Sequence, residues 1–159
     1  MNYRGDLNTE QQNKNSLNID KMEVEEILHA INNEDASIAD VVKSAIPQIE
    51  ETVNHAVSSV KNGGRVFYVG AGTSGRLGVL DASEIPPTFS ASKDNFIGII
   101  SGGDKALRRS IEGAEDSVTD AIRDLEKFNL DNKDTLIGIS CSGAASYVIS
   151  ALDHARERE

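Results

Sequence analysis

The sequence has few cysteines, no long apolar runs and a deficit of basic residues. Its one cysteine, Cys141, excludes an internal disulfide and favours a reducing compartment. No stretch approaches the roughly 20 apolar residues of a membrane-spanning helix, and the polar N-terminus lacks the apolar core of a signal peptide. These features predict a soluble, cytoplasmic protein.

The charge balance narrows the possible partners. Acidic residues outnumber basic ones by 26 to 16, giving a net charge of −10. Nucleic acids and anionic membranes repel such a surface, so we expect neither as a partner. A phosphorylated small molecule remains possible, because backbone N–H groups and hydroxyls can hold a phosphate locally. No cluster of His, Cys, Asp and Glu has the spacing of a metal site, so no metal is expected.

The first 62 residues are expected to form an N-terminal arm followed by helices. Residues 1–18 are polar and without hydrophobic period, which predicts an extended or mobile arm. A first helix is expected after this arm, and a second, longer one beginning at Asp35. Its apolar stripe runs at helical spacing from Ile38 to Val60, with a kink expected at Pro47. Because this stripe exceeds what one chain can cover, it favours a homodimer.

Residues 63–159 alternate between short apolar runs and amphipathic segments. The runs predict strands at 66–69, 96–100 and 135–139, and the segments between and after them predict helices near 75–81, 104–111, 116–127 and 144–157. This order is typical of an α/β fold, a three-layer parallel sheet flanked by helices. Three strands make a thin sheet, which suggests that later strands are missing.

The loop after the first predicted strand carries the pattern G-x-G-x-x-G, formed by Gly70, Gly72 and Gly75. The pattern alone is a weak indicator of dinucleotide binding, and no acidic residue ends the next strand to hold a ribose. Thr73 and Ser74 instead place two hydroxyls at a helix N-terminus, which suits a phosphate or a sugar. A purely structural tight turn is the alternative.

The loop after the third predicted strand repeats this chemistry. Ser140, Ser142 and Gly143 surround Cys141 just before a helix, which is typical of an anion-binding nest. Ordinary helix capping explains such a pattern equally well. Two such loops in one sheet are harder to explain by capping alone. Cys141 itself has no nearby histidine to activate it, so we interpret it as a small loop residue.

Two glutamates are candidates for acid–base chemistry. Glu84 precedes the pair Pro86-Pro87, whose fixed backbone could aim its side chain, and Glu115 stands at the start of a predicted helix. Two carboxylates near one sugar can supply the acid and the base of an elimination. The simpler alternative is that both are surface residues, with Glu115 favoured by the helix dipole.

The stretch VGAGTSGRLGVLDASEIPPTFS resembles the bacterial N-acetylmuramic acid 6-phosphate etherases, members of the sugar isomerase (SIS) superfamily. Three further segments resemble the same family in the same order, namely TEQQNKNSLNIDKM, IISGGDKALRRSIEGAEDS and IGISCSGAASYVISALDHAR. The similar segments run from about Thr9 to Arg156. The combination of DASE-x-PPT with EGAED is far more specific than a general phosphosugar-binding pattern.

The resemblance implies a lyase of cell-wall sugar recycling that releases D-lactate and N-acetylglucosamine 6-phosphate. It implies Glu84 and Glu115 as the catalytic acids. It also implies Gly72, Thr73 and Ser74 in the first loop, and Ser140, Ser142 and Gly143 in the third, as the phosphosugar-binding groups. Members of the family are homodimers with the active site near the subunit interface, and they use no metal or organic cofactor.

The sequence departs from the family in two respects. Where family members usually read S-G-R-T-P-Y, this chain reads Ser142-Gly143-Ala144-Ala145-Ser146-Tyr147, and family members are roughly twice as long. Two other functions therefore stay open beside the etherase. One is a non-catalytic regulator that binds a sugar phosphate, and the other is an inactive, truncated SIS domain.

Overall fold

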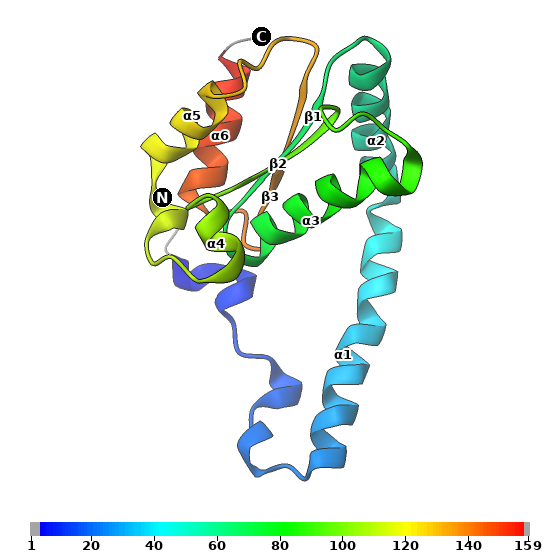
Figure 1. Ribbon diagram of the computed structural model, residues 1–159. Helices are drawn as coiled ribbons and strands as arrows, with labels where there is room; N and C mark the ends of the chain where they lie inside the picture. The colour runs from blue at the N-terminus through cyan, green and yellow to red at the C-terminus, as the bar shows by residue number, and fades with distance from the viewer. Residues whose placement is uncertain (1–3, 158–159) are drawn as a thin grey trace. The chain divides into compact units, whose positions relative to one another are not determined.

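The computed structural model describes residues 4–157 and contains two compact units, the first ending at residue 54 and the second beginning at residue 55 (Figure 1). No helix in the described part of the chain is long and apolar enough to cross a membrane.

The N-terminal unit begins with short 3-10 turns rather than the extended arm expected for residues 1–18, of which residues 1–3 lie outside the described part. The turns are η1 (Arg4–Asp6), η2 (Asn8–Glu10), η3 (Lys14–Ser16) and η4 (Ile19–Lys21). Side-chain bonds stabilise them: Asn13 accepts from the Asn15 N–H at 2.7 Å, and Asn15 Nδ2 donates to Glu34 Oε1 at 2.6 Å. Local polar contacts thus replace the missing hydrophobic period.

Helix α1 (Val24–Ser44) runs without interruption through Asp35, so the predicted second helix start there is wrong. The helix is capped instead by Glu23, whose N–H donates to Glu26 Oε2 at 2.8 Å in a capping box. Asp35 is exposed, so its carboxylate stays in water and needs no cap position. The break comes at Ala45, and Pro47 lies in the first turn of α2 (Ile46–Lys61), where its missing N–H costs nothing. The predicted kink is thereby confirmed.

The C-terminal unit contains the three strands at nearly the predicted positions. They are β1 (Val66–Gly70), β2 (Phe96–Ile100) and β3 (Thr135–Ile139), all parallel, in the order β2-β1-β3. The helices are α3 (Gly72–Phe89), α4 (Asp104–Arg108), α5 (Val118–Glu126) and α6 (Ser146–Arg156), with the 3-10 turn η5 (Ala114–Asp116) before α5. Helix α3 is longer than predicted, because Pro86 and Pro87 stand inside its last turns instead of ending it.

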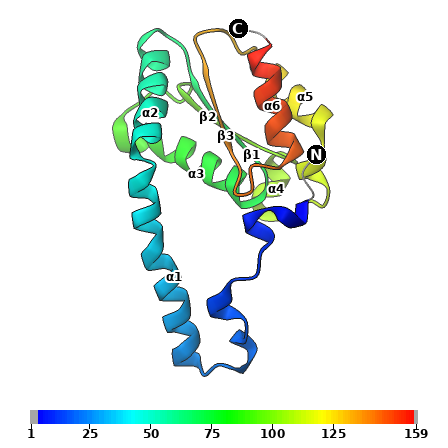
Figure 2. The same cartoon turned by 180° about the vertical axis from the view of Figure 1, so that it is seen from behind.

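The predicted three-layer arrangement is confirmed. Helix α3 covers one face of the sheet, and α5 and α6 cover the other (Figures 1 and 2). The close approach of α3 depends on Gly98 of β2, where an added Cβ would lie 2.5 Å from the Val79 Cα. A side chain there would force the helix off the sheet.

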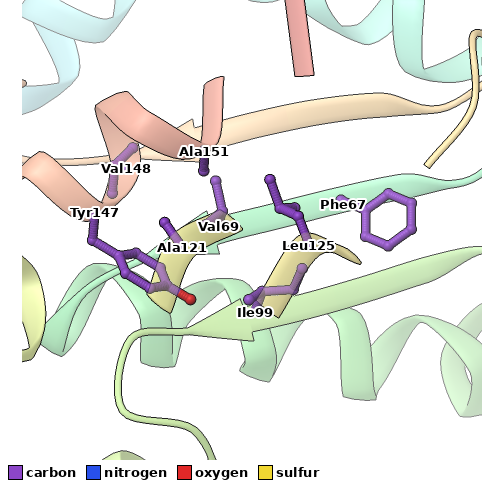
Figure 3. Packing of buried hydrophobic residues seen from close by; sticks show 8 residues of the cluster. All are labelled: Phe67, Val69, Ile99, Ala121, Leu125, Tyr147, Val148 and Ala151. Atoms are coloured by element: carbon purple, nitrogen blue, oxygen red, sulfur yellow. The ribbon is translucent and has the colours of Figure 1, made fainter. Parts of the chain in front are cut away.

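The core lies between the sheet and the pair α5 and α6 (Figure 3). Its buried residues are Phe67, Val69, Ile99, Ala121, Leu125, Tyr147, Val148 and Ala151. Tyr147 is fully buried, and its hydroxyl donates to Asp124 Oδ2 at 2.8 Å, so its one polar atom is satisfied. Burial and this hydrogen bond both raise the pKa of Tyr147 above its usual range. Residue 147 therefore acts as a neutral core side chain.

An ion pair closes the sheet at the amino ends of β1 and β3. Arg65 Nη2 lies 2.6 Å from Asp134 Oδ2, and Arg65 Nη1 donates to the Phe128 carbonyl at 3.0 Å. Burial alone would raise the pKa of Asp134, but the hydrogen bonds and charge of Arg65 and the hydrogen bond from the Asp131 N–H together outweigh it and hold this pKa below the ordinary value. The Arg65 Cζ atom also lies over the ring of Phe67, 4.8 Å from the ring centroid. This cation–π contact connects the ion pair to the core.

The three histidines all lie on helices but differ in exposure. His29 and His55 are exposed, but His154 is half-buried, and its Nε2 is shielded without a hydrogen-bond partner among the described residues. The difference arises because α6 packs against α5 and β3, which leaves little of its circumference in water.

Candidate functional site

The polar loops gather at the carboxyl edge of the sheet. In the parallel registers Gly70 is level with Ile100 of β2 and with Ile139 of β3, so all three strands end together. The GAGTSG and SCSG loops therefore leave the sheet at the same edge, as predicted. This is the edge at which open α/β sheets bind ligands.

The first loop turns directly from β1 into α3. Gly72 begins the helix at φ +55°, a conformation that favours glycine, and an added Cβ on Gly75 would lie 2.6 Å from the Gly70 carbonyl oxygen. Ala71 gives the helix no side-chain cap, so none of its first N–H groups is occupied by a capping side chain. Thr73 is exposed and Ser74 is half-buried beside these groups. The turn can therefore present N–H groups and hydroxyls to an anion.

The third loop caps itself in this structure. Ser140 Oγ accepts from the Gly143 N–H, and Ser142 Oγ accepts from the Ala144 N–H, both at 3.1 Å. Helix α6 begins only at Ser146, so the loop stands ahead of the helix instead of opening it. Cys141 is exposed at its tip. Each hydroxyl accepts one N–H and still has its own O–H to donate to an anion, whereas the N–H groups of Gly143 and Ala144 are already engaged.

A cavity of about 170 Å³ opens beside the first loop, on the β2 side. Its lining consists of Ala71, Gly72, Arg76, Ser101, Ala106, Ser110, Ile111, Glu112, Gly113, Ala114 and Glu115. The cavity thus brings Gly72 and Glu115 together. The other predicted site residues, Thr73, Ser74, Glu84, Ser140, Ser142 and Gly143, do not line it.

Ser101 holds the segment that carries Glu115. It is 2% exposed, at the carboxyl end of β2, and its hydroxyl donates to the Ala114 carbonyl, adjacent to Glu115. Glu115 itself lies in η5, whereas α5 begins at Val118 under a cap from Ser117. Glu115 therefore stands ahead of the first turn of α5, outside the short reach of that helix's dipole, and lines the cavity.

Arg76 is the cavity residue that the sequence analysis missed. It lies one turn into α3, its Nε donates to the Leu107 carbonyl at 3.2 Å, and it is the one cationic side chain among the described residues that line the cavity. Its position directly after GTSG was the available signal. Among residues 4–157, no group of three or more His, Cys, Asp or Glu side chains is arranged to hold a metal ion.

Glu84 lies on a different part of the molecule. It is exposed on α3, eight residues after Arg76, which corresponds to about 12 Å along a helix axis. Leu77 and Leu80, each 56% exposed, share its outward face, since they precede it by seven and four residues. The two predicted catalytic glutamates do not line one cavity within this chain.

Comparison with known proteins assigns this arrangement to a family. A family model described as the glucokinase regulatory protein N-terminal SIS domain matches residues 48–156. The chain belongs to this SIS domain family. The match includes every strand of the sheet and both polar loops, so the resemblance to the SIS superfamily predicted from the motifs is confirmed.

The SIS chain is also similar to curated etherases. It is 50% identical over 155 residues to N-acetylmuramic acid 6-phosphate etherase 1 of Bacillus licheniformis, which covers 98% of this chain and 51% of that protein. It is 55% identical over 139 residues to the N-acetylmuramic acid 6-phosphate etherase of Bacteroides fragilis, which covers 87% of this chain and 50% of that protein. The chain therefore spans about half the length of the curated relatives it matches.

Removal of the Ser101 hydroxyl tests how the SIS domain holds Glu115. Replacing Ser101 by Ala leaves the Ala114 carbonyl without its donor, which should destabilise the fold by about 1–3 kcal/mol. We expect faster amide hydrogen exchange in residues 111–117, with core strands still protected. Ser110→Ala, at an exposed position of the same cavity, is the matched control. Unchanged exchange in residues 111–117 would show that the Ser101 bond does not position this segment.

Proposed function

We propose that the protein containing this chain is a lyase that cleaves N-acetylmuramic acid 6-phosphate into N-acetylglucosamine 6-phosphate and D-lactate. The observation that carries the proposal is the roughly 50% identity to etherases of that name over nearly the whole chain. A cytoplasmic location and the absence of a cofactor are parts of the proposal.

The sugar phosphate is proposed to bind in the SIS domain, residues 63–159, at the carboxyl edge of the sheet. Gly72, Thr73 and Ser74 offer uncapped N–H groups and hydroxyls at the start of α3. The third loop, which follows the neighbouring strand β3, is proposed to contribute the hydroxyls of Ser140 and Ser142, with the turn between them and α6 made at Gly143. Local dipoles of this kind bind a phosphate in spite of the net charge of −10.

The proposed reaction is an elimination followed by hydration. In the open-chain sugar, Glu115 as a carboxylate removes the C2 proton. The electron pair forms the C2–C3 double bond while the C3–O bond breaks, and the departing lactate oxygen receives a proton from Glu84. Water then adds to C3, and a proton returns to C2. At the start of the reaction Glu115 must therefore be ionised and Glu84 must be protonated.

Glu84 is proposed to act on the site of a second copy of the chain. Its distance along α3 from the cavity separates it from Glu115 of its own chain. The exposed Leu77 and Leu80 beside it give this face of α3 the apolar character of a contact surface. A second copy covering this face would bring a carboxyl group to the opposite side of a bound sugar.

An apolar stripe on α1 and α2 supports the homodimer independently. Its side chains are all exposed, and most of them follow the one before by three or four residues: Val24, Leu28, Ile31, Ile38, Val41, Val42, Ile46, Ile49, Val53 and Val57. Stripes with this spacing bury themselves against another helix. We propose that the partner helix belongs to the second copy.

The division of labour between the two glutamates is tested by isotope exchange. Glu84→Gln should reduce lactate release by about 10²- to 10⁴-fold but should still exchange the C2 hydrogen of N-acetylglucosamine 6-phosphate with deuterium. Glu115→Gln should lose both activities, because it lacks the base. The measurements are a lactate assay and NMR in deuterium oxide.

The same assays separate the alternatives. A regulator or an inactive SIS domain would release no lactate even as wild type, which would overturn the etherase proposal. Normal deuterium exchange in Glu115→Gln would leave the etherase standing but reverse the assigned roles.

Subunit complementation tests the contribution of Glu84 from the second copy. Glu84→Gln and Glu115→Gln, each inactive alone, should recover about a quarter of the wild-type activity when mixed, since half of random dimers are mixed and one of their two sites is intact. If both glutamates acted from one chain, no mixed dimer would hold an intact site, and the mixture would stay inactive.

The stripe is tested by light scattering. Val42→Asp places a carboxylate in the proposed dimer contact, where an unpaired buried charge costs several kcal/mol, so it should turn a dimer into a monomer. Asn33→Asp adds the same charge on the opposite side of α1, where it is exposed, and should leave the dimer intact. A wild-type monomer at high micromolar concentration would contradict the proposal.

A further inference from the structure

We propose that Arg76 selects the substrate by binding the carboxylate of its lactyl group. The inference rests on the proposed etherase function and adds a specificity-determining residue to it. The observation is that one guanidinium lies in the same cavity as Glu115, anchored by a backbone carbonyl.

The electrostatics of the cavity require a cation for this substrate. N-acetylmuramic acid 6-phosphate carries two anionic groups, the phosphate on C6 and the carboxylate of the ether substituent on C3. The cavity presents two carboxyl side chains, Glu112 and Glu115, in a chain whose net charge is −10. A third carboxylate entering from the substrate would be repelled by both, unless a positive group stood beside it.

Arg76 meets this requirement. Its Nε donates to the Leu107 carbonyl at 3.2 Å, and within residues 4–157 neither Nη group makes a hydrogen bond or an ion pair. A guanidinium held at Nε keeps the N–H groups of both Nη atoms available. Two parallel N–H groups match the two oxygens of a carboxylate, which makes arginine more selective than lysine for this contact.

The order of the strands places the two proposed anion sites on either side of the start of α3, and Gly72 borders both, since it stands in the first loop and lines the Arg76 cavity. The start of α3 stands over the central strand β1, the third loop follows β3 on one side, and the Arg76 cavity opens toward β2 on the other. With neighbouring strands about 4.8 Å apart, the ends of β3 and β2 are separated by about 10 Å. A phosphate held at the β1 and β3 loops therefore leaves the C3 substituent to extend toward β2 and Arg76.

The alternative role for Arg76 is phosphate binding, and it makes a different prediction. A phosphate contact would be shared by every hexosamine 6-phosphate, whereas a lactyl contact is made only by the muramic acid derivative. N-acetylglucosamine 6-phosphate, which keeps the phosphate and lacks the lactyl group, is therefore the diagnostic ligand.

The experiment compares three variants of the protein containing this chain. Arg76→Gln removes the charge, and Arg76→Lys keeps the charge without the planar guanidinium. Arg108→Gln removes the charge of an exposed α4 side chain that does not line the cavity. For each, kcat/KM is measured for lactate release from N-acetylmuramic acid 6-phosphate, and Kd is measured for N-acetylglucosamine 6-phosphate by titration calorimetry.

In Arg76→Gln, kcat/KM should fall about 10- to 100-fold, the loss expected for one charge-assisted hydrogen-bond pair. The Kd for N-acetylglucosamine 6-phosphate should stay unchanged, which also shows that the variant folds. Arg76→Lys should fall between wild type and Arg76→Gln, and Arg108→Gln should match wild type. If Arg76→Gln fails to fold, the same selective loss in Arg76→Lys decides the matter.

Three results would overturn the inference. A parallel loss of both quantities in the folded Arg76 variants would assign Arg76 to the phosphate. No loss of either would remove it from substrate binding. Wild-type protein that binds N-acetylglucosamine 6-phosphate but releases no lactate would refute the etherase function, and the lactyl contact with it.

Discussion

The carbonyl oxygen of Gly70 is the point on which the carboxyl edge of the sheet depends. It accepts the Ser101 N–H at 3.0 Å, which joins the ends of β1 and β2. On its other side Gly75 approaches so closely that no side chain would fit between them. Ser101 in turn donates its hydroxyl to Ala114. One short chain of contacts therefore fixes the start of α3, the end of β2 and the segment bearing Glu115 relative to one another.

This dependence explains which parts of the molecule could be predicted from the sequence. The strands and the edge where their loops meet follow from local patterns, because buried parallel strands are apolar runs and their loops always leave at the carboxyl end. The cavity could not be derived in this way. Ser101 and Ala114 lie 13 positions apart, on either side of α4, and no sequence pattern predicts the hydrogen bond between them. Arg76 was visible in the motif, but its role depends on Leu107, which belongs to another helix.

The two glutamates show where proximity in a motif misleads. Glu84 follows the GAGTSG loop by only nine residues, so the two are close together in the sequence. In a helix each residue adds about 1.5 Å along the axis, so Glu84 lies far from the edge of the sheet at which α3 begins. Glu115 is further along the sequence but returns to that edge through η5. Residues in the loops after strands stay at the edge, whereas residues late in a crossover helix leave it. We therefore propose that a second copy of the chain brings the two glutamates together.

The polar groups at the two edges of the sheet differ in how completely they are paired. Those at the amino edge stabilise the fold, and those at the carboxyl edge are available to a ligand. At the amino edge Arg65 is paired with Asp134 and with backbone carbonyls, and these contacts hold β1 and β3 together. At the carboxyl edge Arg76 is anchored through a single nitrogen, and the start of α3 has no side-chain cap. A polar group that is fully paired stabilises the fold but offers a ligand nothing, while an incompletely paired one costs stability until a ligand completes it. The unpaired capacity at the carboxyl edge is therefore the physical reason to look for the substrate there, in a chain whose overall charge would otherwise repel it.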